Sequence, residues 1–212
     1  MAQTDFGKFN SLKVKGMVNM HKLIILRGNS GSGKTTIAKE LQQAFGSNTM
    51  LISQDVIRRD MLRVKDGENT IALPLMEELM RYGRKNSEIV ILEGILNSEW
   101  YFRLFELAVD LYDKNVYAYY FDLPFEETLK RHRTKPNCNE FGKEEMRRWW
   151  KEKDYVSILN EVNITADEEK ESIVRKIYRT VVSISLSVFT MLLVSMLIAF
   201  VFFIYIIQKY IL

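Results

Sequence analysis

A glycine-rich turn constrains this chain more than any other part of its sequence. The pattern G-x-x-x-x-G-K-[ST] is matched at every fixed position by Gly28 to Thr35. Residues 22–27 before it form a short apolar run that predicts a strand, and residues 34–45 after it show a helical pattern. Glycines let such a turn wrap closely around an oxyanion, while backbone N–H groups and the helix N-terminus point at the phosphate. The turn therefore predicts a phosphate-binding loop that follows a first strand.

We expect this loop to bind the phosphates of ATP together with Mg²⁺. The Lys34 ammonium can reach the β and γ phosphates, and the Thr35 hydroxyl can ligate Mg²⁺. The expected nucleotide-binding residues are Gly28, Asn29, Ser30, Gly31, Ser32, Gly33, Lys34, Thr35 and Thr36.

The composition narrows the class of protein. A chain of 212 residues with 47% hydrophobic and 27% charged residues can form one medium globular domain with an appendage. The net charge of +3 is too small to indicate nucleic-acid binding by itself. Cys138 is the single cysteine, so an intrachain disulfide is excluded, and the two histidines argue against a histidine-based metal site.

Apolar runs alternate with helical patterns from residue 22 to about residue 165, which is typical of a parallel sheet with crossover helices. Further strands are expected at 49–53, 89–92, 116–121 and 162–165. Helices are expected at 54–62, 70–86, 98–113, 124–134 and 143–157. This predicts an α/β fold of the P-loop NTPase type, a doubly wound, five-stranded, mainly parallel sheet flanked by helices. We expect one domain over residues 20–180, with a helical lid at about 133–153, after an N-terminal arm at residues 1–19.

The composition changes sharply near the C-terminus. Residues 181–207 carry no charged side chain, and a helix of that length would reach about 40 Å, enough to span a membrane with tilt. Three basic residues at 175, 176 and 179 precede it, which places the main domain in the cytoplasm by the positive-inside tendency. We therefore expect a single-pass membrane protein with a short tail at 208–212. A buried core helix and a non-native tail from an altered reading frame remain as alternatives.

Two carboxylates follow strands that lead to the same edge of the expected sheet. Asp55 can take a proton from an acceptor hydroxyl, and Arg58 or Arg59 lies on the same helical face to balance the charge of a transferred phosphoryl group. The alternative is that Asp55 only caps the helix. Glu93 ends a buried strand, where it can hold Mg²⁺ through water, bind acceptor hydroxyls, or pair with a core arginine.

A third group of residues is basic. Arg131 and Arg133 lie at the end of an expected helix before a polar segment, an arrangement that suits a lid closing on ATP and excluding water. A solvated basic face at a helix C-terminus is the alternative. Trp149 and Trp150 can stack on an acceptor or pack the lid helix, and packing is favoured.

The quoted stretches resemble the small P-loop kinases. Four stretches carry this resemblance: the opening GNSGSGKTT, then LISQDVIRRDMLR, VILEGIL and YFDLPFEETLKRHRTK. They are most similar to the branch with polynucleotide kinase-like, zeta toxin-like and chloramphenicol phosphotransferase-like members. The stretch ILEGIL also resembles uridine kinases. The resemblance covers about residues 20–180. It implies a phosphotransferase with Lys34 and Thr35 on ATP–Mg²⁺, Asp55 as the acceptor base and the region of Arg131 and Arg133 as the lid.

These features give two hypotheses of different class. The first is an ATP-dependent kinase that phosphorylates a hydroxyl of a small molecule, with Mg²⁺ bound by Thr35 and Glu93. Its expected catalytic residues are Lys34, Asp55, Arg58, Arg131 and Arg133. The second is a membrane-anchored module that binds ATP and sequesters a ligand, such as an antibiotic, without phosphorylating it. A kinase for polynucleotide ends is disfavoured by the modest net charge.

Overall fold

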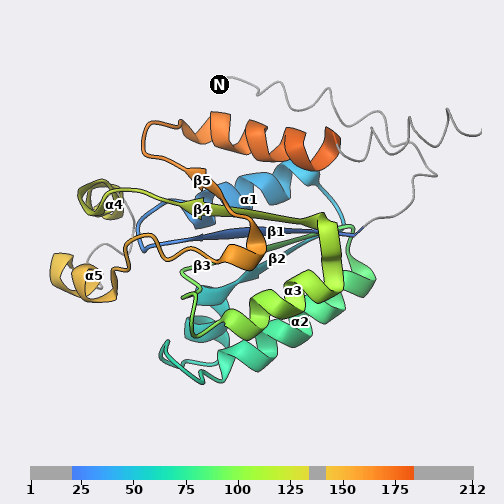
Figure 1. The fold of residues 1–212 in the computed structure, drawn as a ribbon, viewed down its shortest axis with the longest axis horizontal. Helices are drawn as coiled ribbons and strands as arrows, with labels where there is room; N and C mark the ends of the chain where they lie inside the picture. Colours follow the sequence, from blue (N-terminus) through green and yellow to red (C-terminus); the bar gives the residue numbers. More distant parts are fainter. Residues whose placement is uncertain (1–20, 134–141, 184–212) are drawn as a thin grey trace, which may run out of the picture. The chain divides into compact units, whose positions relative to one another are not determined.

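The computed structural model describes residues 21–133 and 142–183 of the chain. Residues 19–175 form one compact unit built on a five-stranded sheet (Figure 1). The strands are β1 (Lys22–Gly28), β2 (Thr49–Ser53), β3 (Ile89–Gly94), β4 (Val116–Phe121) and β5 (Val162–Ile164). They lie in the order β2-β3-β1-β4-β5, and each of these pairings is parallel. The prediction of a five-stranded parallel α/β sheet is confirmed.

Helices cover both faces of the sheet. α1 (Lys34–Phe45) lies on one face, whereas α2 (Ala72–Asn86) and α3 (Phe102–Tyr112) lie on the other (Figure 1). The remaining helical segments are η2 (Val56–Met61), η3 (Asp113–Asn115), α4 (Phe125–His132), α5 (Lys143–Trp149) and η4 (Ser157–Leu159). A further helix covers residues 170–183, of which 170–175 belong to this unit and 176–183 to a second one.

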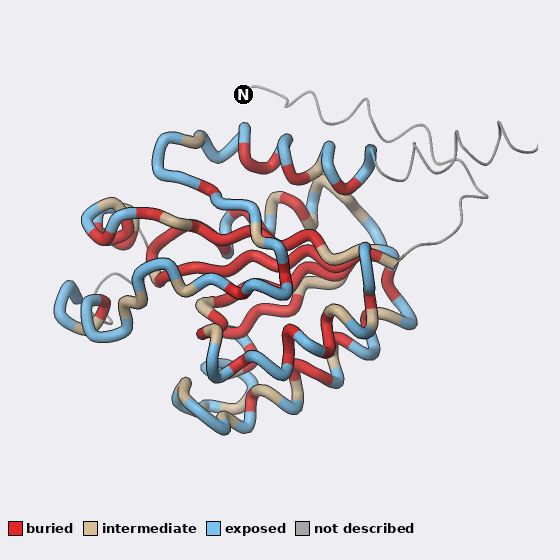
Figure 2. Tube along the Cα trace, viewed as in Figure 1, coloured by how far each residue is buried: buried red, intermediate tan, exposed pale blue. Residues whose placement is uncertain are grey.

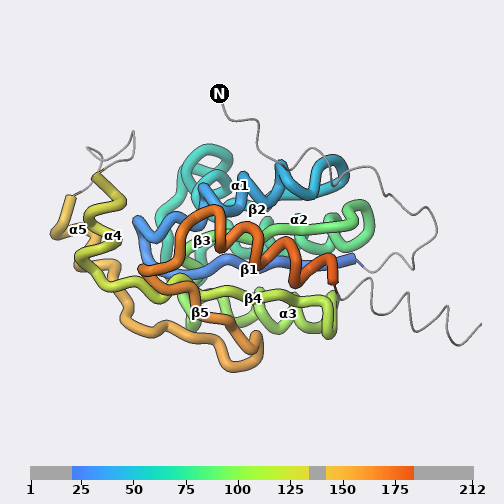
Figure 3. Tube along the Cα trace, turned by 90° about the horizontal axis from the view of Figure 1, so that it is seen from above, coloured from blue at the N-terminus to red at the C-terminus, as the bar shows by residue number. Residues whose placement is uncertain are grey.

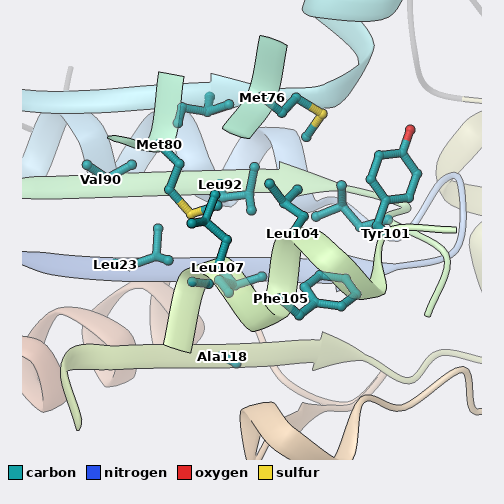
Figure 4. Packing of buried hydrophobic residues seen from close by; sticks show 14 of the residues in the cluster. Leu23, Met76, Met80, Val90, Leu92, Tyr101, Leu104, Phe105, Leu107 and Ala118 are labelled. Carbon is teal, nitrogen blue, oxygen red and sulfur yellow. The ribbon is translucent and has the colours of Figure 1, made fainter. Parts of the chain in front are cut away.

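The central strands are apolar because helices bury them on both sides. Every residue of β1 is buried, and Figure 2 shows the strands in the middle of the sheet as buried. Figure 4 shows Leu104 and Phe105 of α3 packed with Leu92 of β3 in the core. The core therefore fixes the central strands, and through them the loops at their carboxyl ends.

The connections place the glycine-rich loop where the chain changes direction. α1 carries the chain from β1 to β2 at one edge of the sheet, and the later crossovers carry it back across β1 to β4 and β5. A loop at such a switch point lies in a crevice at the carboxyl ends of the strands. α4 and α5 lie beyond this same end of the sheet (Figures 1 and 3).

Two helices differ from their predicted form. The segment after β2 is a π-helix over η2, and the helix expected at 143–157 ends at Trp149 because the backbone of Trp150 is extended. The N-terminal arm at 1–19 and residues 134–141 of the expected lid lie outside the described residues.

The expectation of a single-pass membrane protein is wrong for the part of the chain that the structure describes. No helix within residues 21–133 and 142–183 is both long enough and apolar enough to cross a membrane. The described helix at 170–183 carries five charged side chains and, at about 1.5 Å per residue, is shorter than a hydrocarbon core of about 30 Å. Most of the expected span at 181–207, and the tail at 208–212, lie outside the described residues.

Two phenylalanines on α3 give a matched test of this core. Phe105 is fully buried, whereas Phe102 is 43% exposed. We expect Phe105→Ala to lower the free energy of unfolding by about 3–5 kcal/mol, because it leaves a cavity between α3 and the sheet. Phe102→Ala, the control, should cost under about 1 kcal/mol. Urea unfolding of both variants checks this, and equal losses would contradict the packing described.

Candidate active site

The glycine-rich loop follows β1 directly and depends on close backbone approach at two positions. Gly28 has φ +137°, and a Cβ there would lie 2.8 Å from the Phe121 carbonyl oxygen on β4. Gly31 has φ +83°, and a Cβ there would lie 2.5 Å from the Thr128 carbonyl oxygen on α4. Both conformations favour glycine, and both contacts leave no room for a side chain. The loop is therefore seated against β4 by Gly28, which the motif requires, and against α4 by Gly31, which stands at a variable position of the motif.

The Lys34 side chain folds back over the loop. Its Nζ donates to the Asn29 carbonyl oxygen at 2.8 Å and to Ser32 Oγ at 3.0 Å, and the residue is 6% exposed. An ammonium group held in this position carries positive charge to the centre of the loop, where phosphate oxygens would lie.

Three side chains from β2, β3 and α1 meet beside the loop. Thr35 Oγ1 donates to Glu93 Oε2 at 3.1 Å, and Ser53 Oγ donates to Glu93 Oε1 at 2.5 Å. Glu93 is 2% exposed and lies opposite Ser53 in the parallel register of β2 and β3. Hydroxyl and carboxylate oxygens are the ligands that Mg²⁺ prefers. In proteins Mg²⁺ usually has only one or two side-chain ligands, besides phosphate and water. This set suits the ion, although the described residues contain no group of three or more His, Cys, Asp or Glu that could hold a metal.

Asp55 lies between β2 and η2 with its side chain 59% exposed. Its Oδ1 accepts a hydrogen bond from Arg58 Nη2 at 2.9 Å and lies 3.5 Å from Arg59 Nε. The expected pairing on one helical face is therefore present. The Asp55 side chain makes no capping hydrogen bond to η2, so the capping alternative does not describe this structure.

A cavity of about 520 Å³ opens beside the start of the loop. Gly28, Asn29 and Ser30 line it on the side of the loop, and Asp55, Arg58 and Arg59 line it as well. A volume of this size is typical of a small-molecule site. The structure thus brings the expected base and its arginines to a cavity that adjoins the phosphate-binding loop.

A buried arginine, which sequence reasoning missed, fixes two further segments of this cavity. Arg27 is 0% exposed, and its Nη1 donates to Glu161 Oε1 at 2.8 Å while Nη2 lies 3.1 Å from Asp154 Oδ2. Its Nε and Nη2 also donate to the Leu96 carbonyl oxygen, at 3.0 and 2.7 Å. The core arginine therefore pairs with Asp154 and Glu161, whereas Glu93 is bonded to two hydroxyls.

A tyrosine completes this buried cluster. The Arg27 guanidinium lies 5.6 Å from the centre of the Tyr120 ring, and the Tyr120 hydroxyl accepts a hydrogen bond from the Asp154 N–H at 3.1 Å. Burial, as the largest cause, raises the pKa of Tyr120 to about 12. The phenol is thus neutral at pH 7 and serves as a fixed hydrogen-bond acceptor.

Asn29 joins the loop to the segment after α5. Its Nδ2 donates to the Lys151 carbonyl oxygen at 2.6 Å, and its Oδ1 accepts from the Lys151 N–H at 3.0 Å. Both backbone groups of Lys151 are therefore occupied by one side chain, which ties the segment after α5 to the glycine-rich loop. An asparagine inside the glycine-rich motif is the only sequence signal for this contact.

The two expected lid arginines differ in their positions. Arg131 Nη1 donates to the Ser32 carbonyl oxygen at 3.2 Å and Nη2 to the Ala166 carbonyl oxygen at 3.3 Å, so this side chain adjoins the loop. Its Nε donates to Glu127 Oε1 at 2.7 Å, and this hydrogen bond lowers the pKa of the Glu127 carboxyl. Arg133 is exposed at the end of α4, next to residues outside the described part of the chain.

The Arg27 cluster yields a test of stability. We expect Arg27→Met to lower the free energy of unfolding by about 3–5 kcal/mol, because it leaves the side chains of Asp154 and Glu161, 10% and 3% exposed, without their guanidinium partner. The control is Arg81→Met, which removes an exposed pair with Glu78 and should cost at most about 1 kcal/mol. Chemical denaturation of both variants is the measurement, and an Arg27→Met loss no larger than the control would show that the cluster adds nothing to stability.

Comparisons with known proteins agree with this geometry. No curated protein matches the sequence. Among solved structures, a gluconokinase from Sinorhizobium meliloti 1021 is 14% identical with a TM-score of 0.58, over 81% of this chain and 98% of the other. A shikimate kinase from Acinetobacter baumannii, in complex with shikimate, is 16% identical with a TM-score of 0.51, over 78% and 95%. A tunicamycin resistance protein from Deinococcus radiodurans is 18% identical with a TM-score of 0.51, over 76% and 95%.

These likenesses establish a P-loop kinase-like fold, in agreement with the fold expected from the sequence. A family model described as an AAA domain, AAA_33, matches residues 23–152, which is more than half of the chain. The chain therefore belongs to the AAA_33 family of AAA domains.

Proposed function

We propose that this protein is an ATP-dependent kinase that transfers the γ-phosphate of ATP to a hydroxyl group of a small molecule. The observation that carries the proposal is the cavity of about 520 Å³ that adjoins the glycine-rich loop and is lined by Asp55. A phosphate-binding loop alone would support nucleotide binding. A second, ligand-sized space beside it, lined by a carboxylate, supports transfer to an acceptor.

Residues of the loop would hold the nucleotide. The backbone N–H groups before α1 and the Lys34 ammonium suit the β and γ phosphates. Thr35 and Glu93 would hold Mg²⁺, directly or through water, with Ser53 fixing the carboxylate from the neighbouring strand. Mg²⁺ bound there would neutralise charge on the phosphates and help to align them for transfer.

Asp55 would act on the acceptor. The acceptor hydroxyl oxygen attacks the γ-phosphorus, the bond from that phosphorus to the β–γ bridging oxygen breaks, and ADP leaves. The hydroxyl proton passes to the Asp55 carboxylate. Arg58 holds this carboxylate by a charge-assisted hydrogen bond at 2.9 Å, so the base is fixed in position before the acceptor binds.

Arg131 would stabilise charge on the nucleotide side of the site. Its guanidinium already lies against the loop through the Ser32 carbonyl oxygen. Preorganised cations of this kind lower the barrier to phosphoryl transfer, because the charge on the transferring group is stabilised without movement of the protein. Arg133 is kept as a second candidate for the same role.

The small size of the acceptor is supported by two of the fold neighbours, which are named as a gluconokinase and a shikimate kinase. A protein that only sequesters a ligand would share the fold, the nucleotide site and the cavity. The two kinds of protein would differ in what becomes of the ligand: a sequestering protein would release it without a phosphate, whereas a kinase would release it phosphorylated.

The metal-binding role of Thr35 gives the first test. We expect Thr35→Ala to weaken Mg²⁺-dependent ATP binding by at least about tenfold, which corresponds to about 1.4 kcal/mol, because a direct oxygen ligand is lost. Thr35→Ser keeps the hydroxyl and should bind ATP like the unaltered protein. Calorimetric titration with and without Mg²⁺ measures this. ATP affinity that responds to Mg²⁺ equally in all three proteins would contradict the assignment.

The proposed role of Asp55 as the base gives the second test. A panel of small hydroxyl compounds, including gluconate and shikimate, is incubated with γ-labelled ATP to find the acceptor. With that acceptor, Asp55→Asn should lower kcat by about 10²–10⁴ while ATP affinity is unchanged, because only proton transfer is lost. Asp60→Asn is the matched control, since Asp60 is an exposed carboxylate on η2, which begins directly after Asp55. Full activity of Asp55→Asn would remove Asp55 as the base.

A further inference from the structure

The cavity beside the glycine-rich loop has an excess of positive charge. Besides Asp55 and its two arginines, it is lined by the cations Lys65, Arg148 and Lys151 and by the carboxylates Asp66 and Asp154. Five cationic side chains therefore face three carboxylates around one space. The excess is two positive charges, if every lining group carries its ordinary charge at pH 7.

The carboxylates of the cavity are already bonded to the protein. Asp66 accepts hydrogen bonds from the Tyr101 hydroxyl at 2.6 Å and from Gln54 Nε2 at 3.1 Å. Asp154 accepts from Ser98 Oγ at 2.5 Å and pairs with buried Arg27. Their oxygens are thus committed to fixing the segments around the cavity. Among the lining cations, Arg58 and Arg59 pair with Asp55 and Lys151 pairs with Glu99, which leaves Lys65 and Arg148 as the candidate contacts of an incoming anion.

Neighbouring arginines on α5 show which cation is directed at the cavity. Arg148 is exposed and lines the cavity, whereas Arg147 lies over the Phe125 ring, 4.5 Å from its centre, and does not line it. Lys65 reaches the cavity from the segment after η2 and is also exposed. Exposed Arg and Lys side chains from separate segments are the groups that bind phosphate.

The same cavity is lined by three tryptophans, Trp100, Trp149 and Trp150. Trp100, just before α3, is 37% exposed, and Trp149, at the end of α5, is 45% exposed. Trp150 is used differently, because it packs edge-to-face on Phe125 with ring centres 5.1 Å apart. Large apolar side chains that stay exposed at a ligand-sized cavity offer flat faces on which a ring can stack.

We infer that the acceptor is a phosphate monoester of a ring-containing alcohol, the chemistry of a nucleoside monophosphate. This inference rests on the proposed function, since it names the acceptor of that reaction. A phosphate monoester carries about −1.5 to −2 charge at pH 7, which matches the excess of two positive charges better than a single carboxylate does. Arg148 and Lys65 bind its phosphate group, its ring stacks on Trp100, and one of its free hydroxyls faces Asp55.

The test uses binding, so that it does not depend on turnover. The full chain is first saturated with Mg²⁺ and a non-hydrolysable ATP analogue to occupy the glycine-rich loop. Three probes are then titrated by calorimetry: uridine 5′-monophosphate, uridine, which lacks the phosphate, and ribose 5-phosphate, which lacks the base. We expect the monophosphate to bind at least about tenfold more tightly than either fragment.

Two pairs of variants assign the contacts. Arg148→Gln should weaken uridine 5′-monophosphate binding by about tenfold and leave uridine unchanged, whereas Arg147→Gln, the neighbouring control, should change neither. Trp100→Ala should weaken the monophosphate by about fivefold or more and leave ribose 5-phosphate unchanged, and Trp100→Phe should restore most of the loss. Thermal unfolding of each variant shows that the fold is kept.

The outcomes separate this inference from the proposed function. No binding of uridine 5′-monophosphate, equal binding of uridine, or an Arg148→Gln variant that binds all probes normally would overturn the inference. A neutral hydroxyl compound that is phosphorylated from labelled ATP, without competition from the monophosphate, would also overturn it and leave the kinase assignment standing. Tight, Arg148-dependent binding of the monophosphate with no phosphate ever transferred would instead contradict the kinase assignment and leave the specificity standing.

Discussion

A guanidinium group buried at the carboxyl end of the central strand is the constraint on which this site depends. Taking a charge out of water costs several kcal/mol unless hydrogen bonds and an opposite charge compensate. Arg27 meets that requirement with the Leu96 carbonyl oxygen and with the carboxylates of Asp154 and Glu161. These acceptors come from the segment after β3 and from the segment before β5. One buried side chain on β1 thereby fixes two loops that border the cavity.

Two different environments lie at this end of the sheet, one suited to a nucleotide and one suited to an acceptor. On one side the glycine-rich loop, Thr35 and Glu93 form a small, largely buried arrangement of N–H groups and hard oxygen donors. On the other side, Asp55 stands in an open cavity among exposed cations and indole rings. Asn29 links the two, because it belongs to the loop and bonds both backbone groups of Lys151. A nucleotide and an acceptor would then occupy adjoining sites that share the rigid carboxyl edge of the sheet.

The sequence predicts the elements of this fold well because the signals are local. Apolar runs bounded by turn residues identify the strands, and β2, η2 and α2 begin within two residues of the predicted positions. The position of the motif residues is a local signal too, since the spacing from Gly28 to Thr35 depends on a single turn, while their roles toward a nucleotide stay predictions. Asp55 was also identifiable, because it directly follows a strand that had to end at this edge.

Other parts of the site depend on contacts between distant residues. Arg27 pairs with partners 127 and 134 positions away, and nothing near it in the sequence signals a buried charge. Ser53 gains its role only from the register that sets it opposite Glu93. Trp149 and Trp150 are adjacent in sequence and both line the cavity, yet Trp150 also packs on Phe125. The segment just after α5 is held at Lys151 by Asn29, which is 122 positions away in the sequence.

The central claim is that the glycine-rich loop presents a phosphoryl group to the cavity lined by Asp55. A crystal structure of the full chain with Mg²⁺ and a non-hydrolysable ATP analogue tests it most directly. We expect the γ-phosphate beside Lys34, the ion bound by Thr35 Oγ1 with Glu93 as a direct or water-bridged partner, and the terminal phosphorus facing the Asp55 cavity. A γ-phosphate directed away from that cavity, or a Mg²⁺ ion without Thr35 among its ligands, would contradict it.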